Sequence, residues 1–551
     1  MKFLSIISIL MTCVDLAAQE TVQLPLSPAE HRHAFFTSST DKCRQETLLS
    51  NPAWTATETF VSDSASHRAI VYSGLSNSDT EGDFMHYEGT GATDWRIGAS
   101  GVHGTPHIGT LSGCIQYARG KHRNIGWSAM RMPELYLPYI STDSCGGDFK
   151  FDSYLAEGTY AFATGTWTLG ARASFYGEQA WRLSDPRALN NTTWLRFSAG
   201  ATRQLGQHLI MFSMGYGRNK QHEQLRYWRP GQQDRFFVCY GFGLYDTRQS
   251  AVSFGKARMY YIDEFTASLQ YLSPITPHPS PLTLHASLAY YHHIMTTEES
   301  DIYNLYESRT NSLLPQIQLT WQPTDAWTMT LSAEASLYMR KGYENIIEEY
   351  LANADYNSYD FRTIDSQQNY TSRINQTNLA LTIGRKIACA YMSVSGGIAT
   401  CSYEDKYKGG MYNIKVNTAT PYVSLASNWH IGMHDRFDLS ARYGRQTVGT
   451  HHYDVEMQNT KIKHLDFQQA FAPYAYRAAD LTLFSLSFTW EHSFHSLTTG
   501  LTCSYYLANG ERCSDASYGG TIGYASTAPM LSPTPDIHKE HRGSITTYVR
   551  F

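Results

Sequence analysis

The sequence contains few charged residues and no long apolar run. Asp, Glu, Lys and Arg make up 17% of the 551 residues, against about 25% in average soluble chains. No apolar stretch approaches the roughly 18 residues that a membrane-spanning helix needs, and the mean hydropathy is -0.38. Together these features exclude a helical membrane protein. A net charge of -5 without a basic stripe also argues against a nucleic-acid partner.

The sequence also lacks the usual signatures of metal and catalytic sites. None of the nine cysteines is spaced as in a zinc site or a small disulfide-rich domain. Cys503 and Cys513 could be joined across the end of a strand, but buried single thiols are the expected state. There is no Gly-x-Ser-x-Gly elbow, and the adjacent His451 and His452 point to opposite faces of a strand. We therefore expect no metal, no cofactor and no catalytic residue.

Long segments that alternate between apolar and polar residues dominate what is present. From Trp327 to Met339 the odd positions are apolar and the even positions are mostly polar, and residues 166–177 and 496–507 alternate in the same way. Such segments are longer than the ~5 to 6 residues of a typical soluble strand and match a tilted membrane crossing. The pattern predicts strands with one side facing lipid and the other facing water.

The end of the sequence continues this pattern and finishes on an aromatic residue. Ile545, Val549 and Phe551 fall on one face of an extended strand. This end resembles the closing strand of an outer-membrane β-barrel, whose terminal aromatic residue is read by the barrel-insertion machinery. We expect these three residues to form that insertion signal.

Short and long connections between the expected strands alternate along the chain. Outer-membrane barrels join their strands by short periplasmic turns and longer external loops in this way, whereas a sandwich or a propeller has no reason to do so. We predict an all-β, transmembrane, antiparallel up-and-down barrel of about 18 strands, within a range of about 14 to 20. Within the long connection 340–372, the spacing of Ile346, Ile347, Tyr350 and Leu351 predicts a short amphipathic helix. The expected short turns are 119–122, 164–166, 204–208, 322–326, 385–388, 430–435 and 491–495.

The chain divides into three segments. Residues 1–19 are predicted to be a signal peptide, because Lys2 is followed by an apolar core and a small-residue cleavage region. Residues 20–62 are polar and irregular, and we expect a periplasmic segment that could partly plug the lumen. Residues 63–551 are the expected barrel, located in the bacterial outer membrane.

Strand parity assigns a set of polar residues to the water-filled side of the barrel. Charges of both signs along a pore can select a polar solute, or they can pair across the interior and make it rigid. The predicted pore-lining residues are Arg172, Arg196, Glu264, Gln270, His285, Glu334, Asp438 and Arg442.

Several segments resemble known outer-membrane families. Residues 113–127, 137–140, 143–150 and 165–171 are similar to a Bacteroidota outer-membrane β-barrel family of unknown function, with Gly146-Gly147-Asp148 as the most specific part. Asn51-Pro52-Ala53 more weakly resembles a motif of fatty-acid-channel-type barrels and of secretion-linked barrels. The first resemblance implies a barrel in the outer membrane. It transfers no site residues, because that family has no assigned activity.

The combined pattern favours a channel or uptake component for a small polar solute. A surface-assembly or secretion-linked scaffold is an alternative, and an outer-membrane barrel enzyme is another, although no residue pattern supports the enzyme. The expected partners are outer-membrane lipid and lipopolysaccharide, the barrel-insertion machinery and other outer-membrane proteins.

Overall fold

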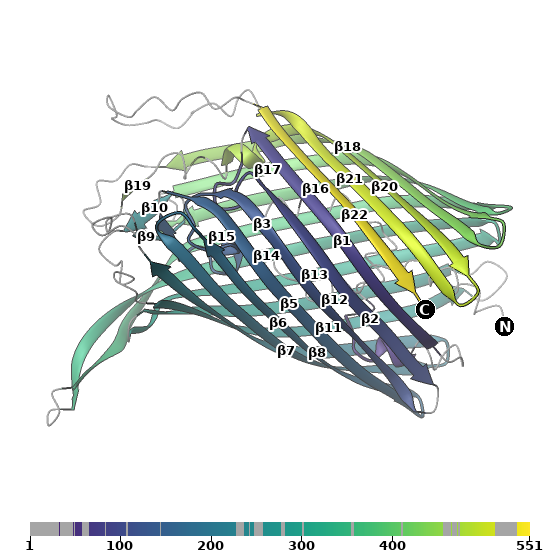
Figure 1. Ribbon diagram of the computed structural model, residues 1–551, viewed down its shortest axis with the longest axis horizontal. Coiled ribbons are helices and arrows are strands. Elements are labelled where there is room, and N and C mark those ends of the chain that lie inside the picture. The colour runs from purple at the N-terminus through teal and green to yellow at the C-terminus, as the bar shows by residue number, and fades with distance from the viewer. Residues whose placement is uncertain are drawn as a thin grey trace.

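The computed structural model of the chain is an almost all-β molecule (Figure 1). No helix among the described residues is long and apolar enough to cross a membrane. The structure describes residues 32, 48, 50–57, 66–82, 84–105, 108–143, 145–226, 236–241, 243–246, 257–276, 282–299, 302–353, 358–408, 412–455, 464–465, 471, 474–512 and 537–551.

Eighteen strands form one antiparallel sheet that closes on itself. Each strand pairs with the next one along the barrel, and β1 pairs with β22 from Ile70–Arg550 to Gly82–His538. The predicted fold and strand number are confirmed. The barrel strands are β1 (Ser66–Gly82), β2 (Gly91–Thr105), β3 (Gly109–Ile125), β5 (Gly147–Thr164), β6 (Trp167–Arg182), β7 (Arg187–Leu205), β8 (His208–Arg226), β11 (Ala257–Thr276), β12 (Leu282–Glu299), β13 (Ile302–Thr324), β14 (Trp327–Asn353), β15 (Ser358–Ile387), β16 (Ala390–Tyr407), β17 (Tyr412–Ile431), β18 (Asp435–Val455), β20 (Ala479–Phe494), β21 (Leu497–Arg512) and β22 (Ile537–Arg550).

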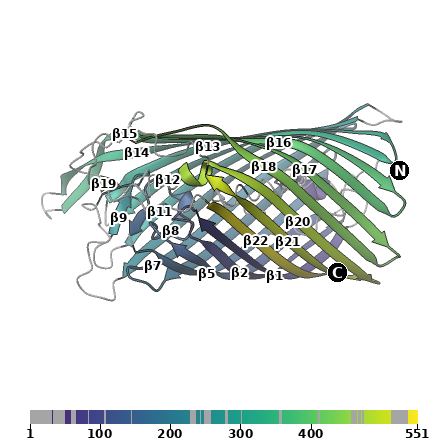
Figure 2. The same ribbon diagram turned by 90° about the horizontal axis from the view of Figure 1, so that it is seen from above.

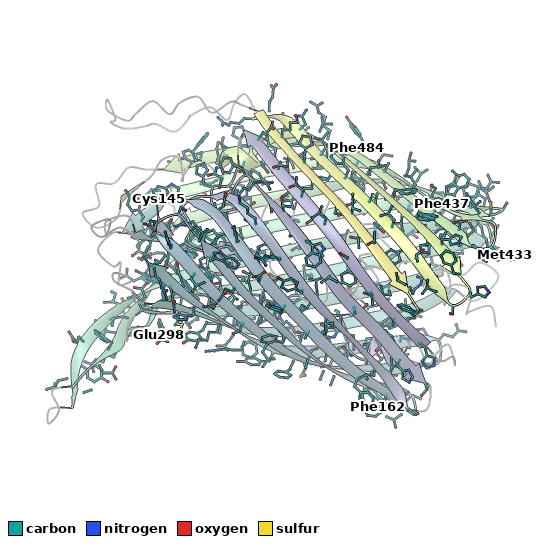
Figure 3. All side chains as sticks on the ribbon, in the orientation of Figure 1. Cys145, Phe162, Glu298, Met433, Phe437 and Phe484 are labelled. Atoms are coloured by element: carbon teal, nitrogen blue, oxygen red, sulfur yellow. The ribbon has the colours of Figure 1, made fainter. Side chains whose placement is uncertain are left out.

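Side chains on the strands alternate between the lumen and the outside of the barrel (Figure 3). On β8, Ile210, Phe212 and Met214 are exposed on the outer face, whereas Met211 and Ser213 between them are buried. A barrel presents such an apolar outer face to lipid. The chain is therefore a bacterial outer-membrane protein, as predicted.

The two ends of the barrel differ in the length of their connections. At one end, two- or three-residue turns such as 165–166, 325–326 and 432–434 join the strands, and the end of β22 lies there (Figures 1 and 2). Figure 3 places Phe162 and Met433 at this end and Cys145 at the other. This is the predicted arrangement of short periplasmic turns and longer external connections.

The predicted turn at 119–122 is wrong, because these residues lie inside β3. Leu111 and Ile115 form the exposed apolar part of its outer face, and the outward charges at Arg119 and Lys121 follow them on the same face. The strand thus continues beyond the lipid, and its charged outer face there imitates a polar turn.

The predicted helix around residues 346–351 is also wrong. This segment belongs to β14, which pairs with β15 in a two-stranded ribbon that projects past the rim of the barrel (Figure 1). Glu348 is opposite Arg362 in the register and forms an ion pair with it. Cross-strand pairing therefore overrides the helical spacing of the apolar residues.

A second, smaller sheet lies at the external end. Its strands are β4 (Ser141–Asp143), β9 (Phe236–Cys239), β10 (Leu244–Asp246) and β19 (His464–Leu465). The 3-10 helix η2 (Pro133–Leu135) precedes β4 in the same connection between β3 and β5.

Candidate functional site

The connection between β3 and β5 is folded against the inner wall instead of extending into the external solution. Met130, Tyr136 and Tyr139 in this connection are completely buried. Its sequence explains the position, because a loop this rich in Met, Leu, Tyr and Ile would expose a large apolar surface in water. We call residues 126–143, together with β9, β10 and β19, the cap.

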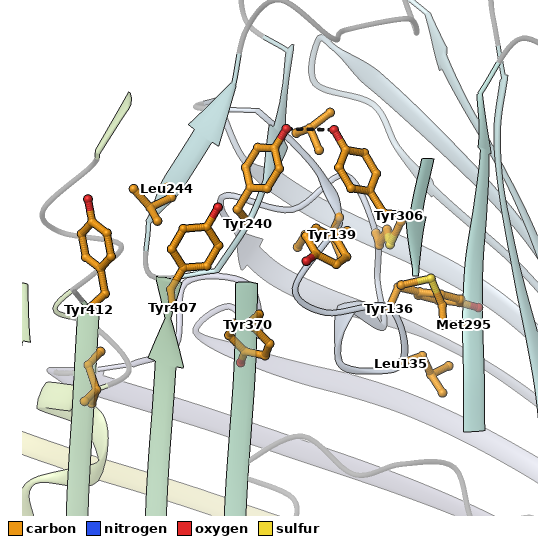
Figure 4. Close-up of a cluster of buried hydrophobic side chains, with 14 of the residues drawn as sticks. Leu135, Tyr136, Tyr139, Tyr240, Leu244, Met295, Tyr306, Tyr370, Tyr407 and Tyr412 are labelled. Atoms are coloured by element: carbon orange, nitrogen blue, oxygen red, sulfur yellow. Dashed lines mark hydrogen bonds between the residues drawn. The ribbon is translucent and has the colours of Figure 1, made fainter. Parts of the chain in front are cut away.

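A cluster of buried aromatic and aliphatic side chains joins the cap to the wall. Eleven of the buried residues in this cluster are tyrosines. Tyr139 of the cap stacks on Tyr306 of β13 with ring centroids 4.8 Å apart. The hydroxyl groups of Tyr240 and Tyr306 are 2.8 Å apart and share a hydrogen bond (Figure 4). Tyrosine suits this position because its ring adds buried area, while hydroxyl groups such as those of Tyr240 and Tyr306 can bond to each other.

Polar contacts attach the cap to five strands around the barrel. These contacts are Arg131 to Glu178 of β6, the Ala129 carbonyl to Asn190 of β7 (2.9 Å), Tyr136 to Asn219 of β8 (2.8 Å), Ser141 to Arg258 of β11 (3.3 Å) and the Leu137 carbonyl to Arg340 of β14 (3.1 Å). Contacts on five strands fix the position of the cap against the inner wall.

Two of the ion pairs at this end are deeply buried. The side chains of Arg131 and Glu178 are 9% and 2% exposed. Arg258 and Glu299 are separated by 2.8 Å and are 0% and 2% exposed. Removing one partner of such a pair leaves a charge without compensation in a dry environment, which costs far more than the loss of a surface pair.

Tyr136 and Tyr139 of the cap remain neutral. Burial raises the pKa of Tyr136 and of Tyr139, because the phenolate form would lose its hydration. Tyr136 accordingly donates to the Asn219 side-chain oxygen.

An N-terminal segment, residues 50–57, lies on the inner wall near the periplasmic end. The Asn51 side chain donates to the Phe212 carbonyl of β8 over 3.1 Å. Its oxygen accepts from the Ala53 N–H at 2.9 Å and so begins a single helical turn. Asn51 and Ala53 are both buried.

Two glycines make room for this segment. Gly170 of β6 and Gly200 of β7 are partners in the strand register. A Cβ atom on Gly170 would lie 2.6 Å from the Ala53 nitrogen, and one on Gly200 would lie 2.1 Å from the Asn51 side-chain oxygen. The Asn-Pro-Ala motif therefore packs directly against the backbone of the wall.

Arg32 contacts the wall near the opposite end. Its guanidinium group donates to the Tyr476 carbonyl over 3.2 Å, lies 3.2 Å from the His538 ring nitrogen, and is 4.4 Å from the centre of the Tyr476 ring. His538 stands at the external end of β22. Described parts of the N-terminal region thus touch the lumen wall at both ends.

The eight predicted pore-lining residues all lie on the inner faces of their strands, where several are bonded to other wall residues. Arg196 donates to Glu264 over 2.9 Å, which brings two of the predicted residues together. Arg172 lies 3.4 Å from Glu157, and Asp438 lies 2.9 Å from Arg436. In these pairs the charges bond to each other within the wall. This is the alternative in which the charges make the interior rigid instead of selecting a solute.

Glu334 and Arg442 belong to one network on the inner wall, which runs from β14 to β18. Glu334 accepts from the Asn378 amide at 2.6 Å, and the Asn378 oxygen accepts from Tyr422 at 2.9 Å. The Arg442 guanidinium lies 4.8 Å from the centre of the Tyr422 ring.

Gln270 and His285 are buried rather than open to the lumen. Gln270 donates to Ser50 over 3.3 Å, so it contacts the N-terminal segment. Whether any of the eight residues contacts a solute stays a prediction.

The strand pattern did not identify the cap residues, although the sequence contained a signal for them. A stretch such as Met130-Arg131-Met132-Pro133 is too apolar for an external loop in water. Its contacts with Glu178, Asn219 and Arg340 involve distant parts of the chain. They could therefore not be read from local spacing.

Cysteines and histidines form no larger cluster in the part of the chain that the structure describes. Cys503 is a free thiol there, while Cys513 lies outside the described residues. Cys145 and Cys389 are exposed, so the expectation of buried thiols is wrong for these two. Among the described residues, no three His, Cys, Asp or Glu side chains are grouped as a metal site.

The closed barrel and its apolar outer face define an outer-membrane β-barrel protein, with a cap attached to the inner wall at the external end. The chain belongs to a family described as a family of unknown function (DUF6850), which matches residues 59–528. This confirms the expected membership of a family of unknown function. The assignment to Bacteroidota stays a prediction.

Solved structures with a similar fold include outer-membrane transporters and receptors. The copper transporter OprC has a TM-score of 0.37 at 8% identity, with 88% of this chain and 80% of that chain covered. The ferric yersiniabactin uptake receptor FyuA from Yersinia pestis has 0.40 at 9%, with the same coverage. The ferric citrate transporter FecA has 0.37 at 10%, covering 88% and 78%. The weaker resemblance of Asn51-Pro52-Ala53 to fatty-acid-channel-type barrels stays a prediction.

No curated protein matches the sequence. At 8 to 10% identity, these solved structures resemble the chain in fold alone. Their substrates are not assigned to this chain. That the chain is not an enzyme also stays a prediction.

Proposed function

We propose that this protein is an uptake component that provides a route across the outer membrane for a small polar solute. The cap closes the external end at rest, and its displacement opens the route. The observation that carries the proposal is the way the cap is held. Five wall strands attach it by hydrogen bonds and ion pairs, so a polar ligand can compete for those partners.

The inner wall below the cap suits a polar solute. The Arg196–Glu264 and Arg172–Glu157 pairs present both signs of charge on the inner face. Such a wall provides hydrogen-bond donors and acceptors to a hydrated molecule and excludes an apolar one.

Removing the cap tests this function. In one variant, residues 129–140 are replaced by a short glycine–serine linker, and single-channel conductance in planar bilayers is compared with that of the intact chain. We expect small or no steps from the intact protein and large, stable steps from the variant. If the folded variant remains closed, the lumen is not a route that the cap controls.

We further propose that residues 20–62 act as a partial plug from the periplasmic side. The contacts of Asn51 with β8 and of Arg32 with Tyr476 and His538 support this role, because they hold parts of the segment against the inner wall. In the variant that already lacks cap residues 129–140, further removal of residues 20–62 after the export signal should raise the conductance. Equal conductance of these two variants would contradict the plug.

Three residues near the end of β22 support the predicted insertion signal. Ile545 and Phe551 are exposed, and Val549 lies on the same outer face. We propose that the barrel-insertion machinery reads this face during assembly. Lipid and lipopolysaccharide then cover the apolar outer surface.

A docking scaffold is a second candidate function, and the projecting β14–β15 ribbon favours it. Described pairing of β13 with β14 ends at Glu344, and pairing of β15 with β16 begins at Tyr370. Beyond these residues the described part of the ribbon pairs only within itself, so both edges present backbone groups to solvent. Its charged residues are Glu348, Glu349, Asp360, Arg362 and Asp365, which are mostly acidic and all exposed.

An acidic ribbon with free edges suits a protein partner that adds a basic, extended segment as a third strand. A peptide of alternating lysine and valine tests this in a binding titration, with an alternating glutamate and valine peptide as the control. The ribbon charges are reversed in a triple E348K/E349K/D360K variant. Equal binding of the basic peptide to both proteins would contradict the scaffold.

A further inference from the structure

Two histidines face each other across the first two strands, on the outside of the barrel at its periplasmic end. His67 of β1 and His103 of β2 are partners in the antiparallel register. Their Nδ1 atoms are 2.9 Å apart, and both side chains are exposed. The ring centroids are 4.5 Å apart with an angle of 41° between the planes.

This separation equals the distance between two neighbouring ligands of one metal ion. A metal–imidazole bond is about 2.0 to 2.1 Å long, so two nitrogens at right angles around one ion lie about 2.9 Å apart. Right-angled nitrogen ligands are typical of Cu²⁺, which prefers tetragonal geometry. A given nitrogen site also binds Cu²⁺ more tightly than the other divalent first-row metal ions.

We propose that His67 and His103 form a two-histidine site for a divalent transition-metal ion, with Cu²⁺ as the preferred ion. Water occupies the remaining coordination positions, because both rings are exposed. No step of the proposed solute route uses either histidine, so the site is independent of the uptake proposal.

The position of the site gives it a structural consequence. The Phe551 N–H donates to the Ala69 carbonyl over 2.8 Å, two residues from His67, where β22 closes the barrel against β1. A bound ion would link β1 to β2 beside this seam. It would therefore stabilise the closed barrel by binding the folded state and not the unfolded chain.

The alternative is a plain hydrogen bond, in which Nδ1–H of one imidazole donates to Nδ1 of the other. Copper binding separates the two possibilities. The full chain, purified without a polyhistidine tag, is titrated with Cu²⁺ and followed by electron paramagnetic resonance. We expect one equivalent of copper with splitting from two nitrogens, and a rise in the thermal unfolding temperature of the barrel.

Single variants His67→Ala and His103→Ala should each weaken copper binding at least tenfold and remove the two-nitrogen splitting. The double variant should be no worse than either single one, because one missing ligand already destroys a chelate. His541→Ala is the matched control, since His541 points outward on the adjacent β22 and is bonded to Tyr505. Heat-dependent gel mobility confirms that each variant is folded.

Two results would overturn the proposal. One is a two-nitrogen copper signal that survives in both single variants. The other is a wild-type protein that binds no more copper than the double variant.

Discussion

Substituting Glu178 by glutamine should release the cap. The Glu178 carboxylate accepts from the Arg131 Nε at 2.8 Å and from the Tyr176 hydroxyl at 2.6 Å. A glutamine at this position would keep the shape of the side chain but remove its charge. The Arg131 guanidinium, which lies 4.2 Å from the centre of the Phe151 ring, would then be buried beside the wall without a counter-charge.

The size of the effect follows from the burial of this pair. Breaking a buried pair by removing one partner costs about 3 to 5 kcal/mol. The cost applies to the docked cap, because a displaced cap returns Arg131 to water. At about 1.4 kcal/mol for each factor of ten, the docked cap should lose roughly two to four orders of magnitude in its equilibrium with the displaced cap.

Two measurements check this result. Single-channel recordings should show more frequent and longer openings in the variant than in the wild type. Amide exchange should become faster in residues 126–143 of the variant. In the wild type, the Ala129 N–H in this segment donates to the Ser141 carbonyl at 3.0 Å. Glu307→Gln is the control, because the Glu307–Arg309 pair lies on the outer face with Arg309 51% exposed, and such surface pairs contribute little.

A Glu178 variant with the conductance and the exchange rates of the control would show that the Arg131–Glu178 pair does not hold the cap. Faster exchange without added conductance would show that the cap moves but does not control the route. The N-terminal segment would then be the remaining barrier to test.

Three further predictions concern other parts of the molecule. Gly200→Ala should displace residues 50–57 and make this segment more sensitive to protease. Gly158→Ala on β5 is the control and should change nothing, because a Cβ there meets no atom within 4 Å. Equal proteolysis of the two variants would contradict the docked segment. Tyr136→Phe should destabilise the docked cap by about 1 to 3 kcal/mol, because the buried Asn219 oxygen loses its donor, and faster amide exchange in the cap measures this. Phe551→Ala should lower the amount of barrel in the outer membrane several-fold without changing the conductance of molecules that assemble; unchanged assembly would remove Phe551 from the insertion signal.

The sequence alone determined the barrel and its orientation. Lipid on one side of a strand and water on the other require a two-residue alternation, and residues 327–339 and 166–177 show it over more than ten positions. The difference between short turns and long connections then predicted which end is periplasmic. Where the alternation continued beyond the lipid, as at Arg119 and Lys121, polar outward residues were mistaken for a turn.

Only the tertiary structure decided what occupies the lumen. Arg131 meets Glu178, Arg32 meets His538, and Asn51 meets Gly200 because closure of the barrel brings distant strands around a common interior. These contacts leave no periodic signal, since each joins residues far apart in the chain. Local spacing even favoured a helix at residues 346–351, where pairing with β15 produced a ribbon. The alternation of a strand reports the two environments beside it, whereas the partner across the lumen depends on how the whole sheet closes.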